Sequence, residues 1–133
     1  MNIIHCEAIF TAVNSLIYQE FLKKILEVLG NGDYTVVMDN APIHHGNKTF
    51  YDTYHYRVRY LPPYSPFLNP CEEVFSQMKN SVRRNGPLNG NNDLTQRMVS
   101  SCTEITTDNL QRYLLHAESF FQKCLNLEDI PRE

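Results

Sequence analysis

Short apolar runs in this chain are separated by longer stretches in which apolar side chains recur every three or four residues. The uncharged, β-branched run at 34–38 predicts a strand covered on both faces, and therefore a central one. Residues 3–10, with their apolar bulk, and residues 57–61 predict two further strands.

Helical spacing is clear over residues 16–29, where Asn14 or Ser15 can cap the helix and Gly30 can end it. Further helices are predicted over residues 44–56, 70–84, 93–103 and 108–126. The order β-α-β-(α)-β-α-α-α indicates an α/β fold with mainly parallel pairing.

Composition limits the possible classes of protein. With 133 residues and 20% charged residues, the chain fits one ordinary globular domain. A net charge of −3 argues weakly against a dedicated nucleic-acid module, although a metal-dependent nuclease needs carboxylates. The four cysteines are far apart and no signal peptide or long apolar span is present, so we expect reduced thiols and no membrane association. The expected location is nuclear in a eukaryote and otherwise cytoplasmic, and not secreted.

Asp39 follows directly after the predicted central strand, at the kind of strand end where α/β proteins bind ligands. The alternative is an Asx turn, in which its carboxylate accepts a hydrogen bond from a backbone N–H two residues on. His44 and His45 come five and six residues later and can touch a substrate or order the loop.

Glu72 lies in the helix predicted over 70–84, whose apolar stripe contains Cys71, Val74, Phe75, Met78 and Val82. A helical wheel places Glu72 at the edge of this stripe and Glu73 on the opposite, solvated side. Glu72 can alternatively complete a capping box with Asn69, with Pro70 at the first helical position.

A polar strip runs along the same flank of this helix. Its members are Ser76, Lys79 and Arg83, followed in sequence by Arg84. They are suited to DNA phosphates leading away from a carboxylate, and a merely solvated face is the alternative.

Two segments resemble the motifs of mariner-like DDE transposases. Residues 36–44 (VVMDNAPIH) are similar to the motif of the second aspartate, and residues 61–79 (LPPYSPFLNPCEEVFSQMK) to the motif of the third acidic residue. Residues 13–22 (VNSLIYQEFL) resemble the helix before the second motif. The resemblance covers about residues 3–125.

This resemblance implies a ribonuclease H-like fold that cuts and joins DNA with two divalent ions, Mg²⁺ or Mn²⁺. Asp39 and Glu72 would then be the second and third acidic ligands. Asn40 and His44 would shape the site, and Asn69 and Pro70 would set up the helix that aims Glu72. The implied partners are transposon ends and target DNA.

The sequence departs from the family pattern in several places. The first aspartate of the family precedes the second motif, and neither Glu7 nor Asp33 lies in its expected context. We therefore expect residues 1–127 to be a partial catalytic domain truncated at its N-terminus, with weak metal binding, followed by a tail over 128–133. A sheet lacking its opening strands exposes an edge, which favours a homo-oligomer. Phe67 replaces an acidic residue common in this loop.

Two alternatives remain open. One is a non-catalytic DNA- or protein-binding remnant, whose salt-dependent DNA affinity would survive Asp39→Ala. The other is an unrelated α/β enzyme in which Asp39 and His44 act as acid and base, and in which Glu72 is remote from Asp39.

We expect the isolated chain not to cleave DNA, because metal-ion catalysis needs ions fixed at defined spacing by a complete set of ligands. The measurement is a nicking assay with Mg²⁺ or Mn²⁺. Turnover that is abolished by Glu72→Gln would contradict this expectation.

Overall fold

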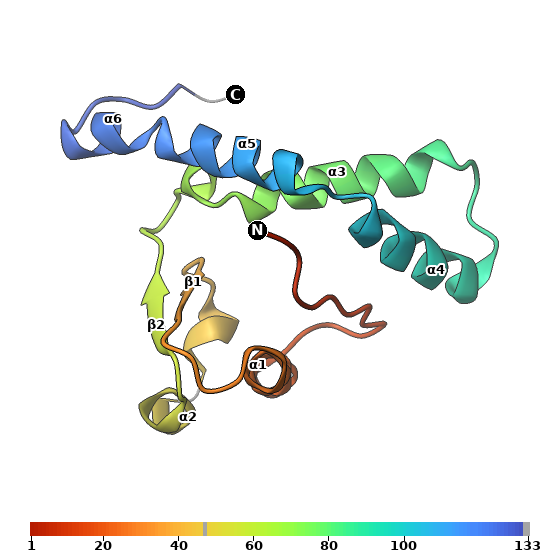
Figure 1. The fold of residues 1–133 in the computed structure, drawn as a ribbon, viewed down its shortest axis with the longest axis horizontal. Coiled ribbons are helices and arrows are strands. Elements are labelled where there is room, and N and C mark those ends of the chain that lie inside the picture. Colours follow the sequence, from red (N-terminus) through yellow and green to blue (C-terminus); the bar gives the residue numbers. More distant parts are fainter. Residues whose placement is uncertain (47, 132–133) are drawn as a thin grey trace. The chain divides into compact units, whose positions relative to one another are not determined.

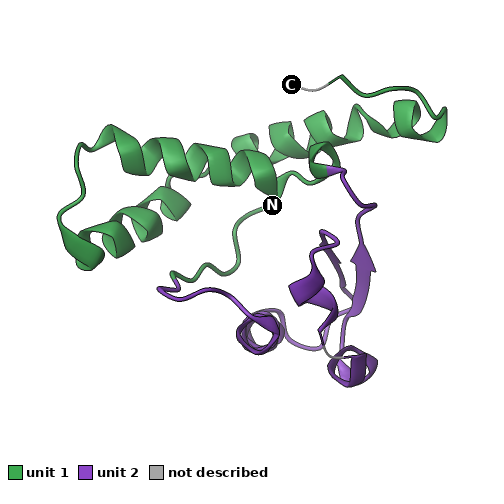
Figure 2. Ribbon diagram, turned by 180° about the vertical axis from the view of Figure 1, so that it is seen from behind, with its two compact units in different colours: residues 1–8, 66–133 green, residues 9–65 purple. Residues whose placement is uncertain are grey.

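A computed structural model describes residues 1–46 and 48–131. Ordered contacts divide the chain into two compact units, which are coloured separately in Figure 2. One unit is the central segment Ile9–Ser65, and the other combines Met1–Ala8 with Pro66–Glu133. We call them the sheet unit and the helical unit, and each is described by itself.

The sheet unit is built on two parallel strands, β1 (Thr35–Met38) and β2 (Arg57–Tyr60), joined through the 3₁₀ helix η1 (Pro42–His45) and the short helix α2 (Lys48–Thr53) (Figure 1). Thr35 pairs with Arg57, and Met38 with Tyr60. The two predicted strands and their parallel pairing are therefore confirmed. The helix expected over 44–56 is instead divided between η1 and α2, and Asn47 lies outside the described residues.

β1 is not the doubly covered central strand that its apolar composition predicted. Within the described residues it pairs with β2 alone, and Val37 is 60% exposed. The next residue, Met38, points to the opposite face of the strand and is buried. The strand is therefore covered on one face, and the branched side chains reflect β propensity rather than burial on both sides.

Helix α1 (Ser15–Leu29) begins and ends where the sequence predicts. The Asn14 side chain accepts a hydrogen bond from the Ile17 N–H, and Gly30 ends the helix with a positive φ of 74°. Its Leu22 is almost completely buried. Tyrosine hydroxyls attach the helix to the rest of this unit, since Tyr54 donates to the Leu22 carbonyl.

The helical unit contains η2 (Pro66–Leu68), α3 (Cys71–Arg84), α4 (Gly90–Thr103), α5 (Thr107–Glu118) and α6 (Phe121–Leu125) (Figure 1). The strand expected over residues 3–10 is absent, because residues 1–14 contain no strand or helix. Residues 1–8 belong to this unit, where the described residues supply no strand to pair with. A single extended segment has no ladder without a partner.

The helix expected over 108–126 is interrupted after α5. The Phe120 N–H donates to the Ala117 carbonyl, a three-residue spacing that tightens the last turn. After this tightened turn, the ring of Phe120 is buried and the ring of Phe121 is 49% exposed. Of the expected tail 128–133, residues 128–131 have no helix and residues 132–133 lie outside the described residues.

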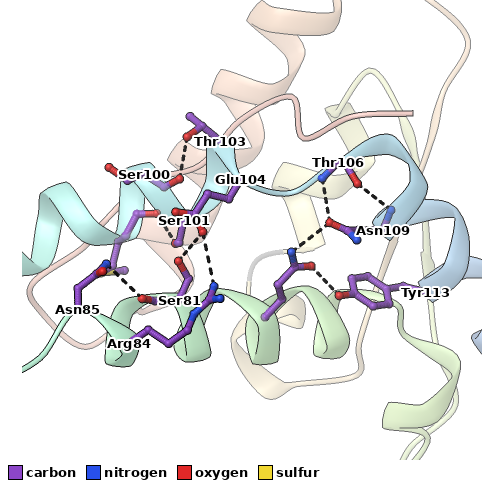
Figure 3. Close-up of polar contacts among 12 residues, drawn as sticks. Ser81, Arg84, Asn85, Ser100, Ser101, Thr103, Glu104, Thr106, Asn109 and Tyr113 are labelled. Carbon is purple, nitrogen blue, oxygen red and sulfur yellow. Dashed lines mark hydrogen bonds and ion pairs between the residues drawn. The ribbon is translucent and has the colours of Figure 1, made fainter.

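The buried face of α3 differs from the one that its apolar residues predicted. Phe75 is 53% exposed, whereas Ser81 is buried. The face toward α4 and α5 is partly polar, because Gln77 bonds Asn109 and Tyr113 across it. Figure 3 shows Ser81 at this interface, where its hydroxyl lies 2.6 Å from the Glu104 carboxylate. Burial of these groups is tolerated because each has a hydrogen-bond partner.

This orientation corrects the wheel for the two glutamates. Glu73, expected on the solvated side, is half-buried and hydrogen-bonds His116 of α5. Glu72, expected at the edge of the stripe, is exposed. At about 100° per residue, Glu72 lies about 180° from Ser81, on the face opposite the helix interface.

Phe67, which stands where the related motif has an acidic residue, packs on the ring of Phe120 with centroids 5.3 Å apart. The His116 ring lies against Phe120 as well, at 5.2 Å. The loop before α3 is therefore attached to α5 by an aromatic contact rather than by a polar one. None of the described helices is both long and apolar enough to span a membrane.

Arg97 fastens α4 to the turn that precedes it. Its guanidinium donates to the carbonyls of Val82, Gly86 and Pro87, at 3.2, 2.7 and 3.0 Å, and to the Asp93 carboxylate. The side chain is only 14% exposed. Hydrogen bonding to the Asn89 backbone, followed by the contact with Arg97, holds the pKa of Asp93 below its usual value.

We expect Arg97→Ala to lower the free energy of unfolding of the helical unit by roughly 2–3 kcal/mol, because it leaves several acceptors without their donor. Arg97→Lys should recover little, since an ammonium cannot reproduce the planar fork. Urea denaturation followed by helical circular dichroism measures the effect. Arg112→Ala, at an exposed position of α5, is the matched control. A loss at Arg97 no greater than at Arg112 would contradict the assignment.

Candidate functional site

Asp39 is the first residue beyond β1, directly after the buried Met38. Its side chain is 50% exposed. Oδ1 of the carboxylate accepts a hydrogen bond from the Ala41 N–H at 3.2 Å and lies 2.8 Å from Nδ1 of His44. The first of these bonds is the predicted Asx turn. The turn holds one carboxylate oxygen and leaves the exposed side of the group available for another role.

His44 is positioned tightly beside this carboxylate. Its Nδ1 also lies 3.0 Å from the Asp39 backbone oxygen, so an Nδ1–H can be shared between the carbonyl and the carboxylate. The ring stacks on Tyr18 at 4.3 Å and its side chain is only 13% exposed. Burial raises the pKa of Tyr18, and the charges of Tyr51 and Asp39 add to the effect. A neutral phenol therefore supports the histidine.

Asn40 is held by the other histidine of η1. His45 hydrogen-bonds the Asn40 side chain and stacks on Tyr60 at 4.1 Å. The Tyr60 hydroxyl in turn donates to the His44 carbonyl at 3.1 Å. The ends of both strands and η1 thus form one connected cluster around Asp39.

Tyr18 and Tyr60 are the parts of this cluster that sequence reasoning did not single out, whereas His45 was noted as a residue that can order the loop. Tyr18 lies within the segment that resembles the helix before the second motif, and this is the signal that could have indicated it. Tyr60, as the last residue of a strand paired with β1, became identifiable only with the register.

In the helical unit, Asn69 and Pro70 set the start of α3. The Asn69 side chain accepts a hydrogen bond from the Cys71 N–H at 3.0 Å. The helix itself begins at Cys71, so Pro70 rather than Asn69 occupies the N-cap, and the predicted start is shifted by one residue. The Asn69 N–H, however, donates to the Pro66 carbonyl. In a capping box that N–H would bond Glu72, and the Asn69 side chain would bond the Glu72 N–H. The Glu72 N–H donates instead to the Asn69 backbone carbonyl, so the predicted box is not formed and the carboxylate of Glu72 is left outside the cap.

Glu72 shares its face of α3 with three of the predicted phosphate ligands. Ser76, Lys79 and Arg83 follow at helical offsets of four, seven and eleven residues, and all are exposed. Arg84 lies apart from them, with its guanidinium 3.9 Å from Glu104 (Figure 3). We call Glu72, Ser76, Lys79 and Arg83 the polar strip.

The predicted site residues are therefore distributed between the two units. The sheet unit brings Asp39, Asn40 and His44 together, and the helical unit carries Asn69, Pro70 and the polar strip. Over residues 1–46 and 48–131, no group of three or more histidines, cysteines or acidic residues could hold a metal ion. Exposed carboxylates are nevertheless the hard oxygen donors that Mg²⁺ and Mn²⁺ prefer, so Asp39 and Glu72 fit such ions chemically.

Comparison with protein families identifies a match over most of the chain. The family of DDE superfamily endonucleases matches residues 4–95, a range that contains Asp39, Glu72 and the polar strip. No curated protein and no solved structure matches the chain. Because the matched range is well over half of the 133 residues, this chain belongs to the DDE superfamily endonucleases.

Proposed function

We propose that this chain is part of the catalytic domain of a mariner-like DDE transposase, with a ribonuclease H-like fold, and that its ancestral reaction is metal-dependent DNA cleavage and strand transfer. The observation that carries the proposal is the family match, which spans both motif-borne carboxylates. The parallel pairing of β1 and β2 through intervening helices supports the fold. The open edge of β1 among the described strands supports self-association.

Asp39 and Glu72 are the proposed ligands for Mg²⁺ or Mn²⁺. When bound, such ions activate an attacking water or hydroxyl and stabilise the leaving oxygen of a phosphodiester. The protein prepares Asp39 by fixing Oδ1 through Ala41 and His44, which restricts the carboxylate to one orientation. Two carboxylates are fewer than the three acidic residues of the family motif, and we propose weak ion binding by this chain.

The same contacts argue against Asp39 and His44 as the acid and base of an unrelated enzyme. His44 is largely covered, stacked on Tyr18, and directs Nδ1 at Asp39 itself. A group in that position orients its neighbour rather than exchanging protons with a substrate. His44 is therefore proposed as a positioning residue for Asp39, and Asn40 as part of the same support.

The polar strip is the proposed track for DNA phosphates. Ser76, Lys79 and Arg83 are exposed on the face of α3 that carries Glu72. A backbone passing along this face would meet hydroxyl, ammonium and guanidinium donors in turn. Arg84 can join only by leaving Glu104, so its contribution is proposed to be smaller.

Replacement of Mg²⁺ by Fe²⁺ with ascorbate and peroxide tests the two proposed ion ligands, because hydroxyl radicals cut the chain beside bound iron. We expect peptide cleavage near both residue 39 and residue 72. Asp39→Asn should abolish the cut near residue 39 and Glu72→Gln the cut near residue 72, since each removes a proposed ligand.

Glu73→Gln is the matched control for the iron experiment, because Glu73 is adjacent in sequence but bonded to His116. It should leave the pattern unchanged. A cut near residue 39 that survives Asp39→Asn, or a cut near residue 72 that survives Glu72→Gln, would show that the carboxylate concerned is not an ion ligand.

The polar strip predicts a salt-dependent affinity for double-stranded DNA. Lys79→Ala and Arg83→Ala should each reduce the slope of log K against log salt by about 1, since each removes one phosphate contact. Fluorescence anisotropy over a salt series measures the slope, with Arg112→Ala as control. An unchanged slope in both variants would eliminate the strip as the DNA track.

The strip also favours a second candidate, a DNA-binding remnant without catalysis. Its donors do not depend on a metal ion. Affinity that survives Asp39→Ala and the absence of divalent ions would favour this role, whereas affinity that requires both would favour the metal-dependent endonuclease.

A further inference from the structure

Residues 1–8 contact the rest of the helical unit at two positions that are remote from them in sequence. The Thr107 hydroxyl donates to the Met1 carbonyl at 2.8 Å. Sγ of Cys6 lies 2.7 Å from Sγ of Cys102 in α4. The first contact uses no sulfur, so it brings the segment to the start of α5 independently of the thiols. Two cysteines that are 96 positions apart are thereby brought face to face.

The environments of the two thiols differ. Cys6 is exposed, whereas Cys102 is half-buried, with Sδ of Met78 at 4.0 Å. Burial, followed by the contact with Cys6, raises the pKa of Cys102. An external oxidant therefore reacts first with the exposed Cys6, and Cys102 is the neighbouring thiol that can react second.

We propose that Cys6 and Cys102 are a redox-sensitive pair that forms a reversible disulfide and fastens the N-terminal segment to α4. The sequence suggested four separate reduced thiols, because the spacing of these cysteines has no recognisable motif. Only the fold brings these two together, and the pair is distinct from Asp39, Glu72 and the polar strip. The proposal is independent of the endonuclease activity.

The oxidant is a low-molecular-weight disulfide such as glutathione disulfide. The Cys6 thiolate attacks one of its sulfurs, breaking the S–S bond and releasing one glutathione thiolate. Cys102 then loses its proton to solvent and attacks the Cys6 sulfur of the mixed disulfide, releasing the second thiolate. Two protein thiols are oxidised and one glutathione disulfide is reduced to two glutathione molecules.

A cross-link between these positions closes a long loop and so restricts the unfolded chain more than a local one would. In a reducing compartment the pair stays as two thiols, and a shift toward oxidising conditions converts it. The stability of the helical unit then becomes dependent on the redox state, without any change in the sequence elements that build it.

The test equilibrates the full chain with glutathione buffers of increasing oxidised fraction, followed by alkylation and peptide mass spectrometry without reductant. We expect one linked peptide pair containing Cys6 and Cys102, with the mass of two hydrogen atoms lost. The oxidised protein should melt roughly 5–15 °C higher than the reduced protein. Excess dithiothreitol should reverse both changes.

Single serine variants separate this pair from random oxidation. Cys6→Ser and Cys102→Ser should both abolish the link and the shift in Tm, whereas Cys71→Ser and Cys124→Ser should keep them. Guanidinium-unfolded chain under the same buffers should favour the link at least about tenfold less, since proximity is lost. Scrambled linkage among the four cysteines, stable mixed disulfides at Cys6, or equal linkage in the unfolded chain would each overturn the proposal.

Discussion

A single helix can bury only part of its circumference, and the face of α3 that is buried determines which of its side chains remain exposed. Its buried face is fixed by directional bonds as well as by apolar contact. Gln77 bonds Asn109 and Tyr113, and Ser81 bonds Glu104. Rotating α3 by one residue would break these bonds and leave buried polar groups unsatisfied, which costs more than moving an apolar side chain. The face that carries Glu72 is consequently left exposed.

The sheet unit depends on other contacts, because two short strands cannot form a stable core alone. Aromatic side chains supply the missing contacts. Tyr56 is buried between the rings of Tyr34 and Tyr54, each 5.6 Å away, while Tyr54 bonds the backbone of α1. The tyrosines of this segment thus supply buried contacts that its small sheet alone would lack. A separate ring contact, Tyr18 stacked on His44, holds the loop that carries Asp39.

Features that depend on neighbouring residues were predicted well from the sequence, whereas features that depend on partners distant in the chain were not. The Asn14 cap, the Gly30 stop and the parallel strands depend on neighbouring residues or simple periodicity, and they are confirmed. The strand expected over 3–10 fails because a strand needs a partner, which its own residues do not specify. The wheel of α3 fails because it assumed an apolar interface. The buried Ser81 and the half-buried Gln77 instead depend on Glu104 after α4 and on Asn109 and Tyr113 of α5.

Asp39 illustrates why a structural role and a functional one need not compete. The Asx turn was the plain alternative to a metal ligand, and the turn is present. A carboxylate has two oxygens, however, and the turn and His44 both engage Oδ1. These contacts fix the plane of the group while half of the side chain remains exposed. A ligand held in this way loses less conformational entropy on meeting a cation than a freely rotating one. The turn is therefore compatible with the proposed ion binding by Asp39 and is not evidence against it.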